Sequence, residues 1–107
     1  MDINVIDIIG ERVDGGIDLY IVISDAIEES EELQTQLLDK IENYLAYINS
    51  SELKKDFPCV AAENVYIKLK FLQKPSEALL EWLHEIKTWV NSNGTNLLIV
   101  SSTTVFN

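Results

Sequence analysis

Hydrophobic and polar residues alternate strictly between Asn64 and Leu72. Apolar side chains fall on one side at a period of two, at Val65, Ile67, Leu69 and Phe71, and Tyr66, Lys68 and Lys70 fall on the other. Successive side chains of a strand point to opposite faces of the sheet, so this pattern predicts a half-buried strand. The strand lies between two amphipathic helical segments, so both helices must pack against the sheet that contains it.

Two earlier segments also have the pattern of strands. Ile3 to Ile9 predicts a first strand, and Ile17 to Ser24 alternates clearly enough to predict a second. Asp14-Gly15-Gly16 separates them, and glycine accepts the positive φ that tight turns require. We therefore expect the two strands to pair as an antiparallel hairpin.

Apolar residues recur at helical spacing between Leu33 and Ile48. This spacing predicts a helix from about Ser30 to Asn49, with Ser30 as the N-cap and Glu31 and Glu32 in the first turn, where the helix dipole favours acids. Three charged residues of this helix are expected to face water, namely Asp39, Lys40 and Glu42. Ser51 to Phe57 is expected to form a short extra turn that ends before Pro58.

A second helix is predicted to open at Pro75-Ser76-Glu77 and to end near Gly94, which is a suitable C-terminal residue. Trp82 and Trp89 are seven residues apart and belong to its apolar side, where core packing is expected. The segment from Thr95 to Ser102 is apolar on both faces and predicts a last strand.

The predicted order is ββαβαβ in a single domain over residues 1–107, an α+β fold. Two right-handed crossovers place both helices on one face of a four-stranded mixed sheet, as a two-layer sandwich. The simplest strand order is 1-2-3-4, antiparallel at the hairpin and parallel beyond it. The opposite face would show Tyr20, Val22, Tyr66, Lys68 and Lys70, with Leu98 and Val100 beside them. Because monomers rarely leave large apolar patches in water, this face is a candidate interaction surface.

Charge narrows the classes of partner. Eighteen acids against eight bases give a net charge of −10, which disfavours nucleic acid and an anionic membrane surface. No apolar run approaches the length of a membrane span, no secretory signal opens the chain, and the single cysteine suits a reducing compartment, so a cytoplasmic protein is expected. The most acidic run contains Asp25, Glu28, Glu29, Glu31 and Glu32. This cluster is either a solvated helix start or a docking patch for a basic partner.

Residues that could carry chemistry are few. His84 is the only histidine, and Glu81 three residues before it does not complete a metal site, so no metal is expected. Cys59 has no partner in the sequence to lower its pKa and is expected to be a small buried residue before the central strand. The glycines form no phosphate-binding pattern, so no cofactor or catalytic residue is predicted. An enzyme that uses carboxylates alone would draw on Asp7, Asp25 and Glu28.

Four segments resemble a family of small bacterial proteins of unknown function: Val5 to Gly10, Ile23-Ser24-Asp25, Lys40 to Ile48, and Pro75-Ser76-Glu77. The likeness extends through nearly the whole chain, and its motifs are structural rather than catalytic. The resemblance implies a bacterial origin and a stand-alone domain, and it implies no activity, ligand or functional residue.

These observations favour a non-enzymatic bacterial protein that acts through protein–protein binding or self-association, as a homodimer or within a complex. An immunity-type inhibitor that neutralises a basic toxin is the alternative within binding proteins, because the chain is small and acidic. From a different class, the carboxylate-dependent enzyme stays a hypothesis.

Overall fold

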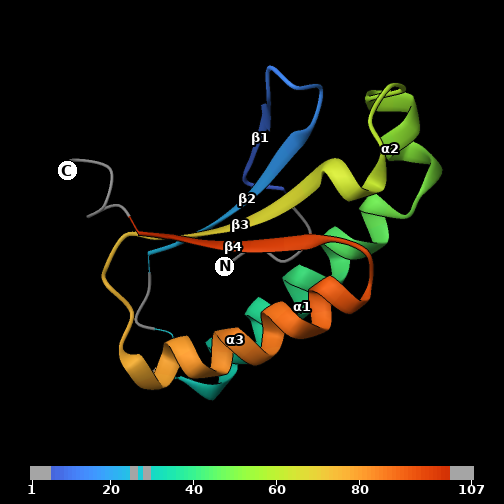
Figure 1. Cartoon of the computed structure of the whole chain (residues 1–107). Helices are drawn as coiled ribbons and strands as arrows, with labels where there is room; N and C mark the ends of the chain where they lie inside the picture. The colour runs from blue at the N-terminus through green and yellow to red at the C-terminus, as the bar shows by residue number, and fades with distance from the viewer. Residues whose placement is uncertain (1–5, 25–26, 28–29, 102–107) are drawn as a thin grey trace.

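The computed structural model describes residues 6–24, 27 and 30–101, with the side chains of residues 62 and 101 excepted. Within these residues the chain forms four strands, three α-helices and one short 3-10 helix (Figure 1). In chain order they are β1 (Ile8–Glu11), β2 (Ile17–Ile23), α1 (Glu31–Ile48), α2 (Ser51–Asp56), η2 (Ala62–Asn64), β3 (Val65–Phe71), α3 (Glu77–Ser92) and β4 (Asn96–Ser101).

The four strands form one mixed sheet in the order β1-β2-β3-β4. β1 runs antiparallel to β2, whereas β2, β3 and β4 are parallel. Leu19 of β2 lies opposite Ile67 of β3, and Ile67 lies opposite Leu97 of β4. The predicted strand order and directions are confirmed, as is the ββαβαβ succession to which α2 adds one short helix.

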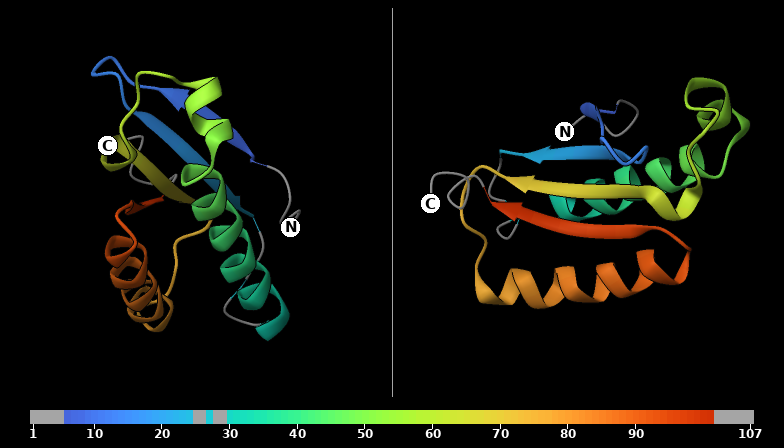
Figure 2. Two further views of the ribbon diagram at one scale, coloured as in Figure 1. Left: turned by 90° about the vertical axis from the view of Figure 1, so that its right-hand side faces the viewer. Right: turned by 45° about the horizontal axis from the view of Figure 1, so that its top comes forward.

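The two longer helices, α1 and α3, cover the same face of the sheet (Figures 1 and 2). The side chains that β2, β3 and β4 direct toward them are almost all buried, and Leu19, Ile67 and Leu97 have no exposed surface. Ile41 of α1 and Leu83 of α3 are fully buried against them. Trp82 and Trp89 are half-buried and pack on this core, as their spacing predicts.

Both long helices begin with the serine caps that the sequence predicts. Ser30 Oγ accepts a hydrogen bond from Leu33 N at 3.2 Å, and Ser76 Oγ accepts one from Leu79 N at 3.1 Å. Each bond satisfies one backbone donor that the first helical turn leaves without a partner. At the other end of α3, Gly94 has φ 81°, a conformation in which a side chain would be strained.

The first strand is shorter and later than the sequence predicts. Residues 1–5 lie outside the described part of the chain, and pairing with β2 begins only at Ile8, opposite Tyr20. Asp7 interrupts the ladder because its carboxylate accepts the Val22 N–H at 2.9 Å, where a strand would supply a backbone carbonyl. The prediction of a strand from Ile3 to Ile9 was therefore wrong for its described residues Ile6 and Asp7.

Two side-chain predictions are also wrong. Lys40 does not face water but is 1% exposed, because its ammonium group is directed to the carboxylate of Asp7. Cys59 is exposed rather than buried, because η2 separates it from the start of β3 and leaves it in the open turn after α2. In contrast, Asp39 and Glu42 are exposed as predicted. None of the described helices is long and apolar enough to cross a membrane.

Candidate functional site

The sheet face that α1 and α3 do not cover, here called the outer face, contains every residue of the predicted interaction surface. The three parallel strands contribute these side chains to it: Asp18, Tyr20 and Val22 of β2, Tyr66, Lys68 and Lys70 of β3, and Asn96, Leu98 and Val100 of β4. The register aligns them in rows across the sheet, so that Tyr20, Lys68 and Leu98 are neighbours, as are Val22, Lys70 and Val100. Except for the buried Asp18, all are half-buried. The described helices leave this face uncovered (Figure 2).

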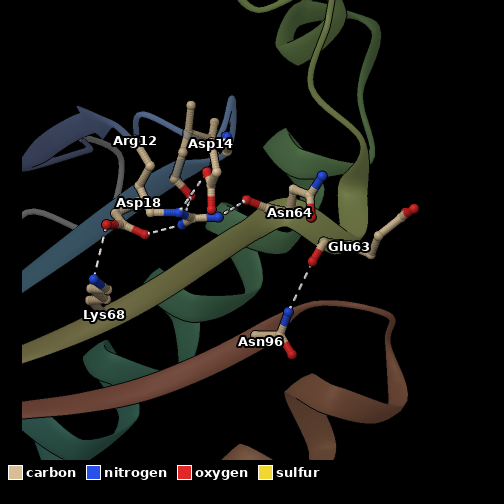
Figure 3. A network of polar contacts seen from close by, with 9 residues as sticks. Arg12, Asp14, Asp18, Glu63, Asn64, Lys68 and Asn96 are labelled. Atoms are coloured by element: carbon tan, nitrogen blue, oxygen red, sulfur yellow. Dashed lines mark hydrogen bonds and ion pairs between the residues drawn. The ribbon is translucent and has the colours of Figure 1, made fainter.

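A buried carboxylate organises the charges at one end of the outer face (Figure 3). Asp18 is 6% exposed and forms ion pairs on both sides, with Arg12 through Oδ1 and with Lys68 Nζ at 2.9 Å through Oδ2. Removing a carboxylate from water is costly unless opposite charges and hydrogen bonds compensate it. Arg12 and Lys68 provide that compensation, so Asp18 fixes two cations in place.

Arg12 joins the β1–β2 hairpin to the start of β3. Its guanidinium donates to the backbone carbonyl of Asn64 at 2.7 Å and to that of Ile17 at 3.2 Å, and it lies 4.5 Å from the centre of the Tyr66 ring. Partial burial opposes its charge, but Asp18 and Asp14 outweigh that effect and raise the pKa of Arg12. Arg12 is therefore permanently charged and connects the parallel strands β2 and β3; we call these contacts of its guanidinium the Arg12 clamp.

Gly16 makes room for this clamp. A Cβ at this position would lie against the Arg12 guanidinium and 2.6 Å from the Asn64 carbonyl oxygen. The neighbouring turn is held by Asp14, whose carboxylate accepts the Gly16 N–H at 2.9 Å. That hydrogen bond is the main reason why the pKa of Asp14 is lowered. The Asp14-Gly15-Gly16 turn thus closes the β1–β2 hairpin and also leaves space for the Arg12 guanidinium beside the outer face.

The two lysines of the outer face differ in their surroundings. Lys68 is bound to Asp18 and lies 5.8 Å from the centre of the Tyr20 ring. The ammonium group of Lys70 forms no hydrogen bond or ion pair with the described part of the chain. Among the β2, β3 and β4 side chains of the outer face, Lys68 and Lys70 stand against the single acid Asp18, and Arg12 beside them is also paired with Asp14. The outer face therefore carries net positive charge in a protein of net charge −10. It therefore presents aromatic, aliphatic and cationic groups together.

The predicted acidic docking patch is only partly described. Glu31 and Glu32 lie exposed in the first turn of α1, where the dipole of the helix favours them. Asp25, Glu28 and Glu29 lie outside the described residues. The two described members support the interpretation of a helix start, and a docking role stays a prediction.

Of the three carboxylates proposed for an enzyme, the structure describes Asp7. Asp25 and Glu28 are outside the described residues, and Asp7 holds the chain in place. Asp7 Oδ1 lies 2.6 Å from Lys40 Nζ, and its backbone N–H donates to the Tyr44 hydroxyl, which in turn donates to the Tyr20 carbonyl at 2.7 Å. Burial raises the pKa of Tyr44 to about 12. Through these contacts and the hydrogen bond from Val22 N, Asp7 connects β2 to α1.

The described part of the chain contains cavities at two places that bear on function. One, of about 320 Å³, lies between the hairpin and the turn after α2, and includes Arg12, Asp56 and Cys59 in its wall. The other, of about 340 Å³, lies between the starts of α1 and α3, beside Gln34 and Trp82. Among the described residues no group of three His, Cys, Asp or Glu side chains is arranged to hold a metal. His84 is exposed on α3.

Sequence reasoning missed two residues that make long-range polar contacts: Arg12, which binds the start of β3, and Lys40, which binds Asp7. A signal existed for Lys40, since it falls between Leu37 and Tyr44 at helical spacing and so interrupts an apolar stripe. Arg12 carried no comparable signal, because residues that flank a hairpin turn are commonly charged and solvated.

Comparison with known proteins gives one match. Residues 1–103 match a family described as a family of unknown function (DUF6572). Neither the curated proteins nor the solved structures contain a significant match to the chain. The family match covers the fold from β1 to β4.

Proposed function

We propose that this chain, which belongs to the family of unknown function DUF6572, is a non-enzymatic protein that binds another protein through the outer face of its sheet. The observation that supports this proposal is a single one: α1 and α3 cover one face, and the other keeps tyrosine, valine and leucine side chains half-exposed. The expected setting is the bacterial cytoplasm, in line with the single cysteine, the acidic composition and the family resemblance.

The charges of the outer face indicate the chemistry of the partner. Lys70 lies between Val22 and Val100, and its ammonium group forms no ion pair within the described chain. Burying an ammonium group at an interface without a counter-charge is costly, so the partner surface should place a carboxylate near Lys70 and apolar side chains around it. Tyr20 and Tyr66 supply rigid, amphipathic area of the kind that is enriched at interfaces.

Selection from a random peptide library tests this proposal. The wild-type chain is used as bait, and Lys70→Glu serves as a counter-selection bait. We expect enriched peptides that combine Asp or Glu with aliphatic or aromatic residues, and that perturb the amide signals of Val22, Lys70 and Val100 on titration. Lys87→Glu makes the same charge change on α3 and should leave binding unchanged. Peptides that bind both baits equally, or that perturb only α1 and α3, would overturn the proposal.

A second candidate function is favoured by the acids of the helix layer. Exposed carboxylates follow the water-facing sides of both long helices, at Glu31, Glu32, Asp39, Glu42, Glu77, Glu81 and Glu85. Such a surface suits a basic partner, as an immunity-type inhibitor of a basic toxin would require. Titration with an oligo-lysine peptide at physiological ionic strength tests the match. Saturable binding that is weakened by Glu81→Gln with Glu85→Gln supports it, and unsaturable or absent binding contradicts it.

A further inference from the structure

The two edges of the sheet differ in how they are closed. At one edge, β1 covers part of β2, and the Asp7 carboxylate takes the Val22 N–H beyond it. At the other edge, the six residues of β4 pair with β3 on one side only, and no hydrogen bond in the described chain reaches its free side. An edge strand of this kind presents a row of backbone donors and acceptors to which another strand can bind.

The sequence of β4 lacks the devices that usually protect an edge. Asn-Leu-Leu-Ile-Val-Ser contains no charge, no proline and no glycine. Leu98 and Val100 are half-buried on the outer face, and Ile99 is only half-buried although it points toward the helices. Apolar side chains therefore border the free backbone on both faces. Natural proteins normally blunt such an edge with lysine, proline or a bulge, because it otherwise pairs with another chain.

The helix beneath this edge carries one acid and one lysine on the same side. At 3.6 residues per turn, one flank of α3 is formed by Glu77, Leu80, His84, Lys87 and Asn91. The opposite flank faces α1, because Trp82 lines the cavity that also contains Gln34. The first flank therefore lies on the side of β4 (Figure 2), with Leu80 37% exposed. In a chain of net charge −10, this is a side on which a second copy meets little like-charge repulsion.

We propose that a second copy of the chain pairs with this edge, β4 against β4 and antiparallel about a twofold axis, so that two four-stranded sheets become one continuous sheet. An isologous contact of this kind is closed and needs only that the strand be complementary to itself. The uncharged β4 meets that condition, and the Leu80 and Ile99 side chains of the two copies would cover the new strand pair from the helix side. The inference goes beyond the proposed binding role, since it leaves both outer faces accessible.

The oligomeric state of the wild-type chain and of variants at the proposed contact tests both self-association and its site. Sedimentation and light scattering of the full chain should show a dimer in the micromolar range. Leu80→Glu should raise the dimer dissociation constant by about tenfold or more, because it places a charge among the apolar side chains that cover the new strand pair. Thr88→Glu adds the same charge to the exposed side of α3 and should not weaken the dimer. Circular dichroism melts of both variants check that folding is retained.

Hydrogen exchange locates the contact. In the dimer every amide from Leu97 to Val100 should be protected, and dilution to monomer should expose those that point away from β3. A chain that is monomeric at all concentrations overturns the inference, whether its free β4 amides exchange rapidly or are protected by another segment of the same chain. A dimer that resists Leu80→Glu but dissociates on Tyr66→Glu also overturns it, and assigns self-association to the outer face instead.

Discussion

Lys40 Nζ of helix α1 and Asp7 Oδ1, just before strand β1, lie 2.6 Å apart. The lysine side chain is 1% exposed and that of the aspartate 25%. The aspartate also accepts the Val22 N–H, so a single carboxylate joins the N-terminal segment, the helix and the sheet. An ammonium group at this depth is tolerated only because the carboxylate is there.

Removing the aspartate should therefore harm the protein more than removing the lysine. We expect Asp7→Ala to lower the free energy of unfolding by about 3–5 kcal/mol, because it leaves Lys40 charged and without its partner. Lys40→Met should lower the free energy of unfolding by a smaller amount, since Asp7 keeps its hydrogen bond from Val22 N and part of its hydration. Urea titrations measure both values.

The double variant Asp7→Ala with Lys40→Met provides the control. We expect it to be more stable than Asp7→Ala alone, because no charge is then left buried. Losses that simply add would show that the two side chains are not coupled.

A charge on the core face of the central strand should unfold the chain. Ile67 has no exposed surface and lies between Leu19 and Leu97 in the sheet. Ile67→Asp places an uncompensated carboxylate there, and we expect a loss of more than about 4 kcal/mol, with no cooperative melting transition. Lys70→Gln, on the other face of the same strand, should melt near the wild-type temperature. A folded Ile67→Asp variant would mean that this face is not the core.

Tyrosine ionisation offers a test against pH. The chain has four tyrosines, and burial raises the pKa of both Tyr44 and Tyr47 to about 12, with Asp56 adding to the effect at Tyr47. Absorbance titration should thus show two late ionisations. Tyr44→Phe should remove one of them and Tyr47→Phe the other.

The same shift affects stability in alkali. The fold favours the protonated form of Tyr44. The contribution of Tyr44 to the free energy of unfolding is therefore fully present below pH 10 and is lost as the pH rises toward about 12. For a side chain this deeply buried the loss amounts to about 3 kcal/mol. Tyr44→Phe should therefore be less stable than wild type at neutral pH, yet lose less on going to pH 12. A parallel alkaline decline in both proteins would contradict this.

Two adjacent glycines should respond differently to alanine. Gly15 has φ 89° and open space around it, so Gly15→Ala should cost about 1–2 kcal/mol through backbone strain alone. In Gly16→Ala the new methyl group meets the Arg12 guanidinium and the Asn64 carbonyl, so the clamp itself must move. We expect the larger loss at Gly16, together with a changed environment of Tyr66 in near-ultraviolet circular dichroism. An equal effect at both sites would show that Arg12 relocates freely.

Strands β2 and β3 and helices α1 and α3 were predictable because each has a clear hydrophobic period. Val65 to Phe71 alternates without exception, and the serine caps at Ser30 and Ser76 mark where the long helices begin. The strand order followed from chain order and the right-handed crossover rule. The outer face was predictable for the same reason, since its residues are the alternate positions of the same strands.

What could not be predicted depends on single side chains that act over long separations. A lysine in a helical stripe is ordinarily expected in water, and only the position of Asp7, contributed by a segment before β1, makes Lys40 a buried residue. Arg12 likewise owes its role to the Asn64 carbonyl, which the chain brings near only after α1 and α2. Such contacts have no local pattern to reveal them.

The parallel arrangement of β2, β3 and β4 also determines how the chain must assemble. Ile17 lies opposite Val65, so the first parallel contact closes a loop of nearly half the chain, whereas the hairpin and the helices need only local contacts. Contacts between distant residues slow folding, because loop closure must precede any gain from burial. We therefore expect refolding to be limited by the docking of β2 onto β3. In stopped-flow experiments Leu69→Ala should then slow refolding, whereas Ile9→Ala, in the local hairpin, should mainly speed unfolding.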